Sequence, residues 1–130
     1  MKVSIITVRF NTAETIEDTI RSVRSQDYKD IEYIVVDGDS TDGTLDILTK
    51  YKSRVSTCIS EPVSGIYDAM NKGIKLSTGD TIGFLNSDDF YADKNVIRRI
   101  VEAIQANKAD CCYGNLGYVA ENNPSKTIRR

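Results

Sequence analysis

The sequence predicts an α/β fold: a mostly parallel sheet with helices on both faces. Two observations predict it. Short apolar runs alternate with stretches of helical periodicity along the chain, and polar clusters recur directly after the apolar runs. Such alternation is typical of parallel sheets, because parallel strands need a crossover that a helix usually supplies. The 130 residues are enough for one compact domain with a real core.

Six apolar runs predict strands. The second run is continuously apolar, as expected of a strand that is buried on both faces. The third is weaker, and the last two are short. The runs lie at residues 3–8, 31–36, 55–60, 81–85, 110–113 and 116–119.

Four stretches predict helices. Thr12 can cap the first, whose acidic residues come early and basic residues late, an order that complements the helix dipole. A short helix is expected around Leu45 and Leu48, and Gly79 is placed to end the third helix. The first, third and fourth predicted helices each have an apolar stripe at helical spacing. In order, the stripes are Ile16, Ile20 and Val23; Ile66, Ala69, Met70, Gly73 and Ile74; and Val96, Ile97, Ile100, Val101 and Ile104.

Composition excludes several classes of partner. The formal net charge is -2 and the pI is near 5.1, so nucleic acid is not expected as a partner. No apolar run approaches the roughly 20 residues that cross a bilayer, and Arg9 interrupts the N-terminal run too early for a signal peptide. Without histidine or a CxxC spacing, the cysteines do not predict a zinc site. Cys58, Cys111 and Cys112 are odd in number and two are adjacent, so they predict buried reduced thiols in a cytoplasmic protein and no disulfide framework.

Polar side chains follow each of the first four predicted strands. The ends of parallel strands share one edge of a sheet, so these side chains are expected to converge into one acidic crevice, where α/β proteins bind ligands. One such cluster would mean little, since these turns are often rich in Asp and Ser. The clusters are Arg9 and Asn11, Asp37 and Asp39, Glu61, and Asp88 and Asp89.

Four well-known motifs do not fit these clusters. Residues 38–44 have the glycine spacing of a phosphate loop but lack its lysine. A calcium loop would place Asp42 where glycine is needed and Leu48 where glutamate is needed. No GxGxxG follows the first strand, which leaves a dinucleotide site with little support. A phospho-acceptor receiver domain needs acids after the first strand, where the sequence has Arg9.

Four segments together resemble the family-2 glycosyltransferases in their order and approximate spacing. They are VSIITVRFN (3–11), YIVVDGDSTDGT (33–44), EPVSGIYDAMNKGI (61–74) and TGDTIGFLNSDD (78–89). The resemblance implies a GT-A fold, with residues 1–119 as the half that binds the nucleotide sugar. Residues 120–130 are polar and end without a terminating element. They are expected to be the start of the acceptor half, or a disordered tail, of a truncated chain.

Asp88 and Asp89 resemble this family's variant of the DXD metal-binding motif. Adjacent carboxylates at the end of a buried strand repel each other, and a bound dication makes them favourable. Mn²⁺ and Mg²⁺ prefer carboxylate oxygens and can neutralise a diphosphate leaving group. The resemblance implies that Asp89 ligates the metal and that Asp88 holds the ribose or shares the metal. The alternative is that both residues cap the following helix.

The resemblance also implies a set of donor-binding residues. Asp37 would accept a hydrogen bond from a base imide, which suits uracil, thymine or the N1 edge of guanine but not adenine. The full set is Thr7, Arg9, Asn11, Asp37, Asp39, Glu61, Asp68, Asn71, Lys72 and Asp88. The local alternatives are turn or capping roles for Asn11, Asp37, Asp39 and Glu61, and an i,i+4 ion pair between Asp68 and Lys72.

The expected activity is metal-dependent sugar transfer, with inversion, from a UDP, GDP or dTDP sugar to a saccharide or lipid-linked acceptor. In this family an acidic residue of the acceptor half deprotonates the acceptor. No residue up to Arg130 matches the position of this acidic residue, so the catalytic base is expected beyond Arg130. The alternatives are a non-catalytic nucleotide-sugar-binding domain and a nucleotidyltransferase, which would need a basic phosphate loop. We expect a cytoplasmic protein that associates peripherally with the inner face of the membrane.

Overall fold

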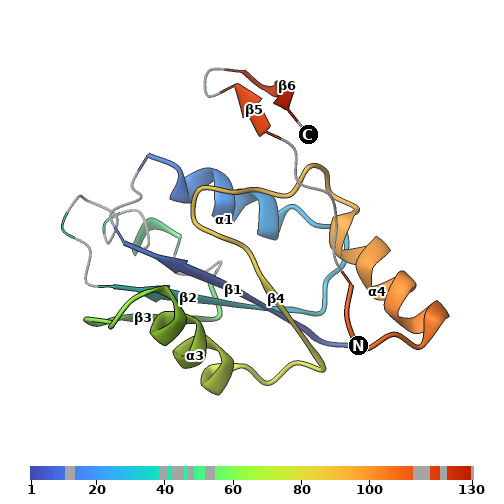
Figure 1. Cartoon of the computed structure of the whole chain (residues 1–130), viewed down its shortest axis with the longest axis horizontal. Helices are drawn as coiled ribbons and strands as arrows, with labels where there is room; N and C mark the ends of the chain where they lie inside the picture. The colour runs from blue at the N-terminus through green and yellow to red at the C-terminus, as the bar shows by residue number, and fades with distance from the viewer. Residues whose placement is uncertain are drawn as a thin grey trace. The chain divides into compact units, whose positions relative to one another are not determined.

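The computed structural model describes residues 1–10, 14–38, 41, 46, 49–51, 55–112, 118–120 and 123–129. These residues fall into two compact units, Met1–Arg98 and Arg99–Arg130. Figure 1 labels the helices and strands of both units. In chain order they are β1 (Val3–Arg9), α1 (Ile16–Arg24), β2 (Ile31–Asp37), β3 (Thr57–Ser60), α3 (Ile66–Leu76), β4 (Thr81–Phe84), α4 (Val96–Asn107), β5 (Tyr118–Ala120) and β6 (Asn123–Arg129).

The first unit is built on a parallel sheet. Its strand order is β3-β2-β1-β4, and each neighbouring pair is parallel. The continuously apolar run is β2, at an interior position next to β1, and residues 33–37 are buried in it. In the second unit β5 and β6 form an antiparallel pair. The prediction of an α/β fold with a parallel sheet is confirmed.

Helices α1 and α3 lie on opposite faces of this sheet, as Figure 1 shows. On one face, Ile6 and Ile34 pack in a buried cluster with Ala69 of α3. A Cβ placed on Gly73 of α3 would meet Ile6 Cγ2 at 2.5 Å, so only glycine allows this close approach of helix to strand. On the other face, the guanidinium of Arg24 from α1 lies 5.7 Å from the ring centre of Tyr33.

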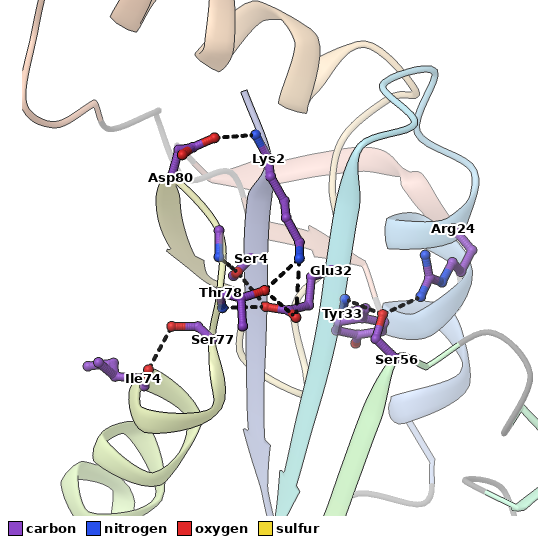
Figure 2. A network of polar contacts seen from close by, with 11 residues as sticks. Lys2, Ser4, Arg24, Glu32, Tyr33, Ser56, Ile74, Ser77, Thr78 and Asp80 are labelled. Carbon is purple, nitrogen blue, oxygen red and sulfur yellow. Dashed lines mark hydrogen bonds and ion pairs between the residues drawn. The ribbon is translucent and has the colours of Figure 1, made fainter.

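The amino end of the sheet is held by a polar network centred on Glu32, shown in Figure 2. Its Oε1 accepts hydrogen bonds from Ser4 Oγ at 2.7 Å and from the Thr78 backbone N–H at 2.8 Å. Its Oε2 accepts one from Thr78 Oγ1 at 2.9 Å, and Lys2 Nζ lies 3.7 Å away. Burial alone would raise the pKa of Glu32, but these partners together lower it. The network ties β1 and β2 to the segment before β4.

Gly79 belongs to this network and does not end the third helix as predicted. Helix α3 ends at Leu76, and its C-cap Ser77 has an extended backbone. The N–H of Gly79 donates to Ser4 Oγ at 2.9 Å. A Cβ at this position would lie 2.5 Å from Ser4 Oγ. Glycine is therefore required here for close packing against β1.

Other local expectations have different outcomes. The first helix begins at Ile16, later than a cap at Thr12 implies, and its N-cap is Thr15. Thr12, Leu45 and Leu48 lie outside the described residues. Residues 110–112 are not a strand, whereas the polar segment after residue 120 contains β6, which its sequence did not predict.

The structure also bears on the cysteines and on possible membrane spans. Cys58, Cys111 and Cys112 are free thiols as predicted, but all three are exposed, so the expectation of burial is wrong. Among the residues with a described placement, no helix is both long enough and apolar enough to span a bilayer.

Candidate functional site

The carboxyl ends of three strands bring Arg9, Asp37 and Ser60 side by side. In the parallel register, Arg9 lies opposite Asp37, and Asp37 lies opposite Ser60. The Nε atom of Arg9 is 3.3 Å from Asp37 Oδ1, and Ser60 Oγ donates to Asp37 Oδ2 at 2.8 Å. Both charged side chains have 0% exposure. An opposite charge offsets part of the cost of burying a charged group, so these two side chains form a buried ion pair at the carboxyl end of the sheet.

This arrangement changes the interpretation of Asp37. Its carboxylate contacts Arg9 and Ser60 of the two neighbouring strands. The alternative of a capping or turn role concerns the segment after Gly38, most of which lies outside the described residues. Ser60 is a member of the cluster that the sequence analysis missed. Its only signal in the sequence is its place at the end of the third strand, equivalent to that of Asp37 at the end of the second.

Thr7 lies deeper in the sheet than Arg9. Its hydroxyl shares a hydrogen bond of 2.9 Å with the Tyr33 hydroxyl, and both side chains are buried. Burial raises the pKa of Tyr33 to about 12, so its phenol stays protonated at neutral pH. Thr7 therefore joins β1 to β2 through its bond with Tyr33, two residues before Arg9 along β1.

The turn after β4 carries the paired carboxylates. The chain leaves the sheet at Leu85, whose N–H donates to the Ile6 carbonyl at 3.0 Å. The N–H of Asp89 then donates to the Asn86 carbonyl at 3.0 Å, which closes a tight turn. Asp88 is exposed and Asp89 is half-buried. The two carboxylates therefore follow directly from the end of a strand, at the same edge as Asp37.

The electrostatics of this turn are unfavourable for two negative charges. Burial raises the pKa of Asp89, the charge of Asp88 raises it further, and a hydrogen bond with Asn86 acts in the opposite direction. The alternative that these residues cap the following helix fails on position. Helix α4 begins only at Val96, and a cap lies immediately before the first turn of its helix.

A third cluster joins the end of β3 to α3. Lys72 Nζ lies 2.7 Å from Glu61 and 3.9 Å from Asp68, and it donates to the Pro62 carbonyl at 3.3 Å. The Ser64 N–H donates to Asp68 Oδ2 at 2.9 Å. The hydrogen bond with Glu61 is the main cause that raises the pKa of Lys72. The i,i+4 pair between Asp68 and Lys72 is thus present, as part of a cluster that orders this loop.

Three further residues belong to the predicted donor-binding set: Asn11, Asp39 and Asn71. Asn71 is exposed on α3. Asn11 and Asp39 lie outside the described residues. The structure therefore places Arg9, Asp37, Glu61, Asp88 and Asp89 at or just beyond the carboxyl ends of the four strands, as the parallel topology requires.

The carboxylates of Asp88 and Asp89 fit one class of metal. Within the described part of the chain, no group of three or more Cys, Asp or Glu residues could hold a metal alone. A structural zinc site needs a closed set of four protein ligands. Mg²⁺ instead binds one or two carboxylates and takes its other ligands from water and substrate phosphates. The donor set at this turn matches that second pattern.

This chain is similar in sequence to known glycosyltransferases. The sequence profile of glycosyl transferase family 2 matches residues 4–130. One relative, the Escherichia coli protein named UDP-Glc:alpha-D-GlcNAc-diphosphoundecaprenol beta-1,3-glucosyltransferase WfaP, is 37% identical over 114 residues. That match covers 87% of this chain and 45% of the relative. This chain spans between 39% and 46% of the length of such relatives.

Two solved structures share the fold. Staphylococcus aureus TarS 1–349 in complex with UDP-GlcNAc has a TM-score of 0.77 at 22% identity, and the match covers 99% of this chain and 45% of that TarS 1–349 chain. The Pyrobaculum calidifontis mannosyltransferase PcManGT, in complex with GDP-Man and Mn²⁺, has a TM-score of 0.74 at 24% identity. It covers 79% of this chain and 32% of PcManGT. The fold of this chain is therefore the GT-A fold.

Proposed function

This chain belongs to glycosyl transferase family 2, and we propose that it is the donor-binding half of an enzyme that transfers a sugar from a nucleoside diphosphate sugar to an acceptor. The observation that carries the proposal is the turn of Asp88 and Asp89. It places two carboxylates, one with a raised pKa, at the carboxyl edge of a parallel sheet. Such an edge is where α/β folds bind their ligands.

The proposed cofactor is Mn²⁺ or Mg²⁺, held by Asp89 and Asp88. When bound, the dication supplies Lewis-acid stabilisation of the diphosphate leaving group. The chain's own residues supply the anchorage: Asp89 is half-buried and fixed by its backbone to Asn86, whereas Asp88 is exposed and free to reach the ribose or the metal. The Mn²⁺ complex of PcManGT supports the choice of metal.

The proposed donor carries uracil, guanine or thymine. Its base imide would donate to Asp37, whose carboxylate is held by Arg9 and Ser60. Because Asp37 is fully buried, this contact requires the side chains around it to rearrange when the nucleotide binds. We propose that Glu61, Asp68, Asn71 and Lys72 also contact the donor. UDP-GlcNAc and GDP-Man in the two solved structures support a nucleotide-sugar donor.

The proposed acceptor is a saccharide or a lipid-linked saccharide. The diphosphoundecaprenol acceptor in the name of WfaP supports this class. A lipid-linked acceptor would also bring the enzyme to a membrane surface, and we propose the inner face as its site of action. An acidic residue beyond Arg130 would deprotonate the acceptor hydroxyl, and attack opposite the leaving group would invert the anomeric centre. In this proposal residues 1–119 bind the donor and residues 120–130 begin the acceptor half.

A thermal-shift panel tests the donor site. The chain and its Asp89→Ala variant are each heated with UDP, GDP, dTDP or ADP, with and without Mn²⁺. We expect one non-adenine nucleotide to raise the melting temperature only when Mn²⁺ is present. At a hundredfold excess over its dissociation constant the gain is about 2.7 kcal/mol, a shift on the order of 10 °C. Asp89→Ala should abolish it. Stabilisation that is metal-independent or selective for ADP would contradict the proposal.

A further inference from the structure

Helix α1 presents a row of polar side chains to the segment that follows β4. Thr15, Thr19, Ser22 and Gln26 recur at intervals of three and four residues, so they lie along one side of the helix. Each contacts the backbone of residues 87–97. This row differs from the apolar stripe of Ile16, Ile20 and Val23, which is buried in the core.

Thr19 lies where this row meets the paired carboxylates. Its hydroxyl is 2.6 Å from the Asp89 carbonyl and 3.0 Å from the Ser87 carbonyl. It therefore contacts the backbone on both sides of Asp88. Thr15 adds a second hydroxyl to the Ser87 carbonyl at 2.9 Å. Although Thr15 is the N-cap residue of α1, its hydroxyl makes this long-range bond and does not cap the helix.

The same row fixes the chain farther along. Gln26 is buried, and its amide donates to the Asp93 carbonyl at 2.7 Å while its oxygen accepts from the Ile97 N–H at 2.9 Å. Ser22 Oγ accepts from the Tyr91 N–H at 3.2 Å. The segment is therefore held at successive points by side chains of α1 and of the residues that flank it, since Thr15 is the N-cap and Gln26 follows the C-cap Ser25.

Burial makes the Thr19 contact important for geometry. The side chain has 1% exposure, and its single O–H is shared among closely placed carbonyls. Without that donor, buried carbonyl oxygens lose a partner, and the local backbone shifts to recover one. A shift at Ser87 or Asp89 changes where both carboxylates point.

We propose that Thr19 is a positioning residue for the cation site: its hydroxyl fixes the backbone on both sides of Asp88, so that the carboxylates of Asp88 and Asp89 are arranged before the cation and diphosphate arrive. This inference rests on the proposed function, since it concerns the same cation. Positioning partners of this kind typically change metal affinity by about 10–100-fold when they are removed.

The test is a titration of Mn²⁺ in the presence of UDP, GDP or dTDP, each in a separate experiment, with bound Mn²⁺ followed by electron paramagnetic resonance. Thr19→Val keeps the shape of the side chain and removes the hydroxyl, whereas Thr19→Ser keeps the hydroxyl. We expect Thr19→Val to weaken Mn²⁺ binding by about tenfold or more. Thr19→Ser should restore most of the affinity. Thr15→Val, which removes the hydroxyl that donates to the Ser87 carbonyl, should weaken binding less.

Ser22→Ala is the matched control, because it removes a hydroxyl from the same row at a point beyond the carboxylates. It should leave the Mn²⁺ dissociation constant within about twofold of wild type. Wild-type Mn²⁺ affinity in folded Thr19→Val, or an equal loss in Ser22→Ala, would overturn the positioning role while the proposed function stands. If the unmodified chain bound no Mn²⁺ with UDP, GDP or dTDP, the proposed function itself would fail.

Discussion

The parallel sheet has an amino edge, where its strands begin, and a carboxyl edge, where they end. Folding shifts the pKa of a carboxylate in opposite directions at these two edges. At the amino edge, Glu32 accepts three hydrogen bonds and lies near Lys2, and its pKa is lowered despite burial. At the carboxyl edge, the pKa of Asp89 is raised by burial and by the neighbouring Asp88. The ionised form is thus stabilised by the fold at one edge and destabilised at the other.

This difference separates structural charge from functional charge. The Glu32 network stabilises the fold, because each acceptor meets a donor from a neighbouring element. A group with a shifted pKa at a ligand-binding edge is a candidate for function. Its charge is unfavourable in the free protein, and a bound ligand of opposite charge can stabilise it. Asp37 is intermediate: it lies at the carboxyl edge, but it is buried in an ion pair with Arg9 and accepts a hydrogen bond from Ser60.

The largest expected effect concerns that intermediate case. Arg9→Met leaves the Asp37 carboxylate buried without its guanidinium, and losing one partner of a buried pair costs about 3–5 kcal/mol. The free energy of unfolding, measured by urea denaturation, should fall by that amount. The double variant with Asp37→Leu should recover most of it, because no buried charge remains. A single variant within about 1 kcal/mol of wild type would show that Asp37 is not held as a buried charge.

A medium effect is expected at the amino edge. Glu32→Gln weakens hydrogen bonds to a charged acceptor and should lower the unfolding free energy at pH 7 by about 1–3 kcal/mol. Because folding lowers the pKa of Glu32 from its ordinary value of 4.5, its stabilisation is present above that pH and is lost as the pH falls through the lowered pKa.

Urea denaturation of wild type and Glu32→Gln from pH 7 to pH 3 checks this prediction. The two free energies should converge as the solution becomes acidic. A difference that stays constant across this range would mean that Glu32 contributes packing and not charge.

The smallest effect should have the opposite sign at the carboxyl edge. Folding raises the pKa of Asp89, so its ionised form destabilises the protein above that pKa, and the penalty disappears as the pH falls. Asp89→Asn should therefore raise the unfolding free energy of the metal-free protein at pH 7, by less than about 1 kcal/mol because the group is partly exposed. Calorimetry in chelator-treated buffer measures it. A loss of stability on this substitution would remove the contrast between the two edges.

The sequence predicted the parts of this molecule that follow from periodicity and chain order. The apolar run at residues 31–36 became the buried strand β2, and the turn at Asp88 follows β4 as the topology requires. The sequence-based predictions failed where a residue's role depends on contacts with residues that are distant in the chain. Gly79 fits the pattern of a helix terminator, yet its packing against Ser4 is visible only in the fold. Ser60 and Thr19 are ordinary polar residues until register and helix docking place them beside Asp37 and Asp89.

The direct test of the central claim is the position of the cation itself. Crystals of the chain grown with Mn²⁺ and the nucleotide selected by the thermal-shift panel would give an anomalous scattering map at the manganese edge. The account predicts a peak in contact with the Asp89 carboxylate, shared with Asp88 and with oxygens of the diphosphate. A peak elsewhere, or a nucleotide bound at this edge with no peak beside Asp89, would contradict it.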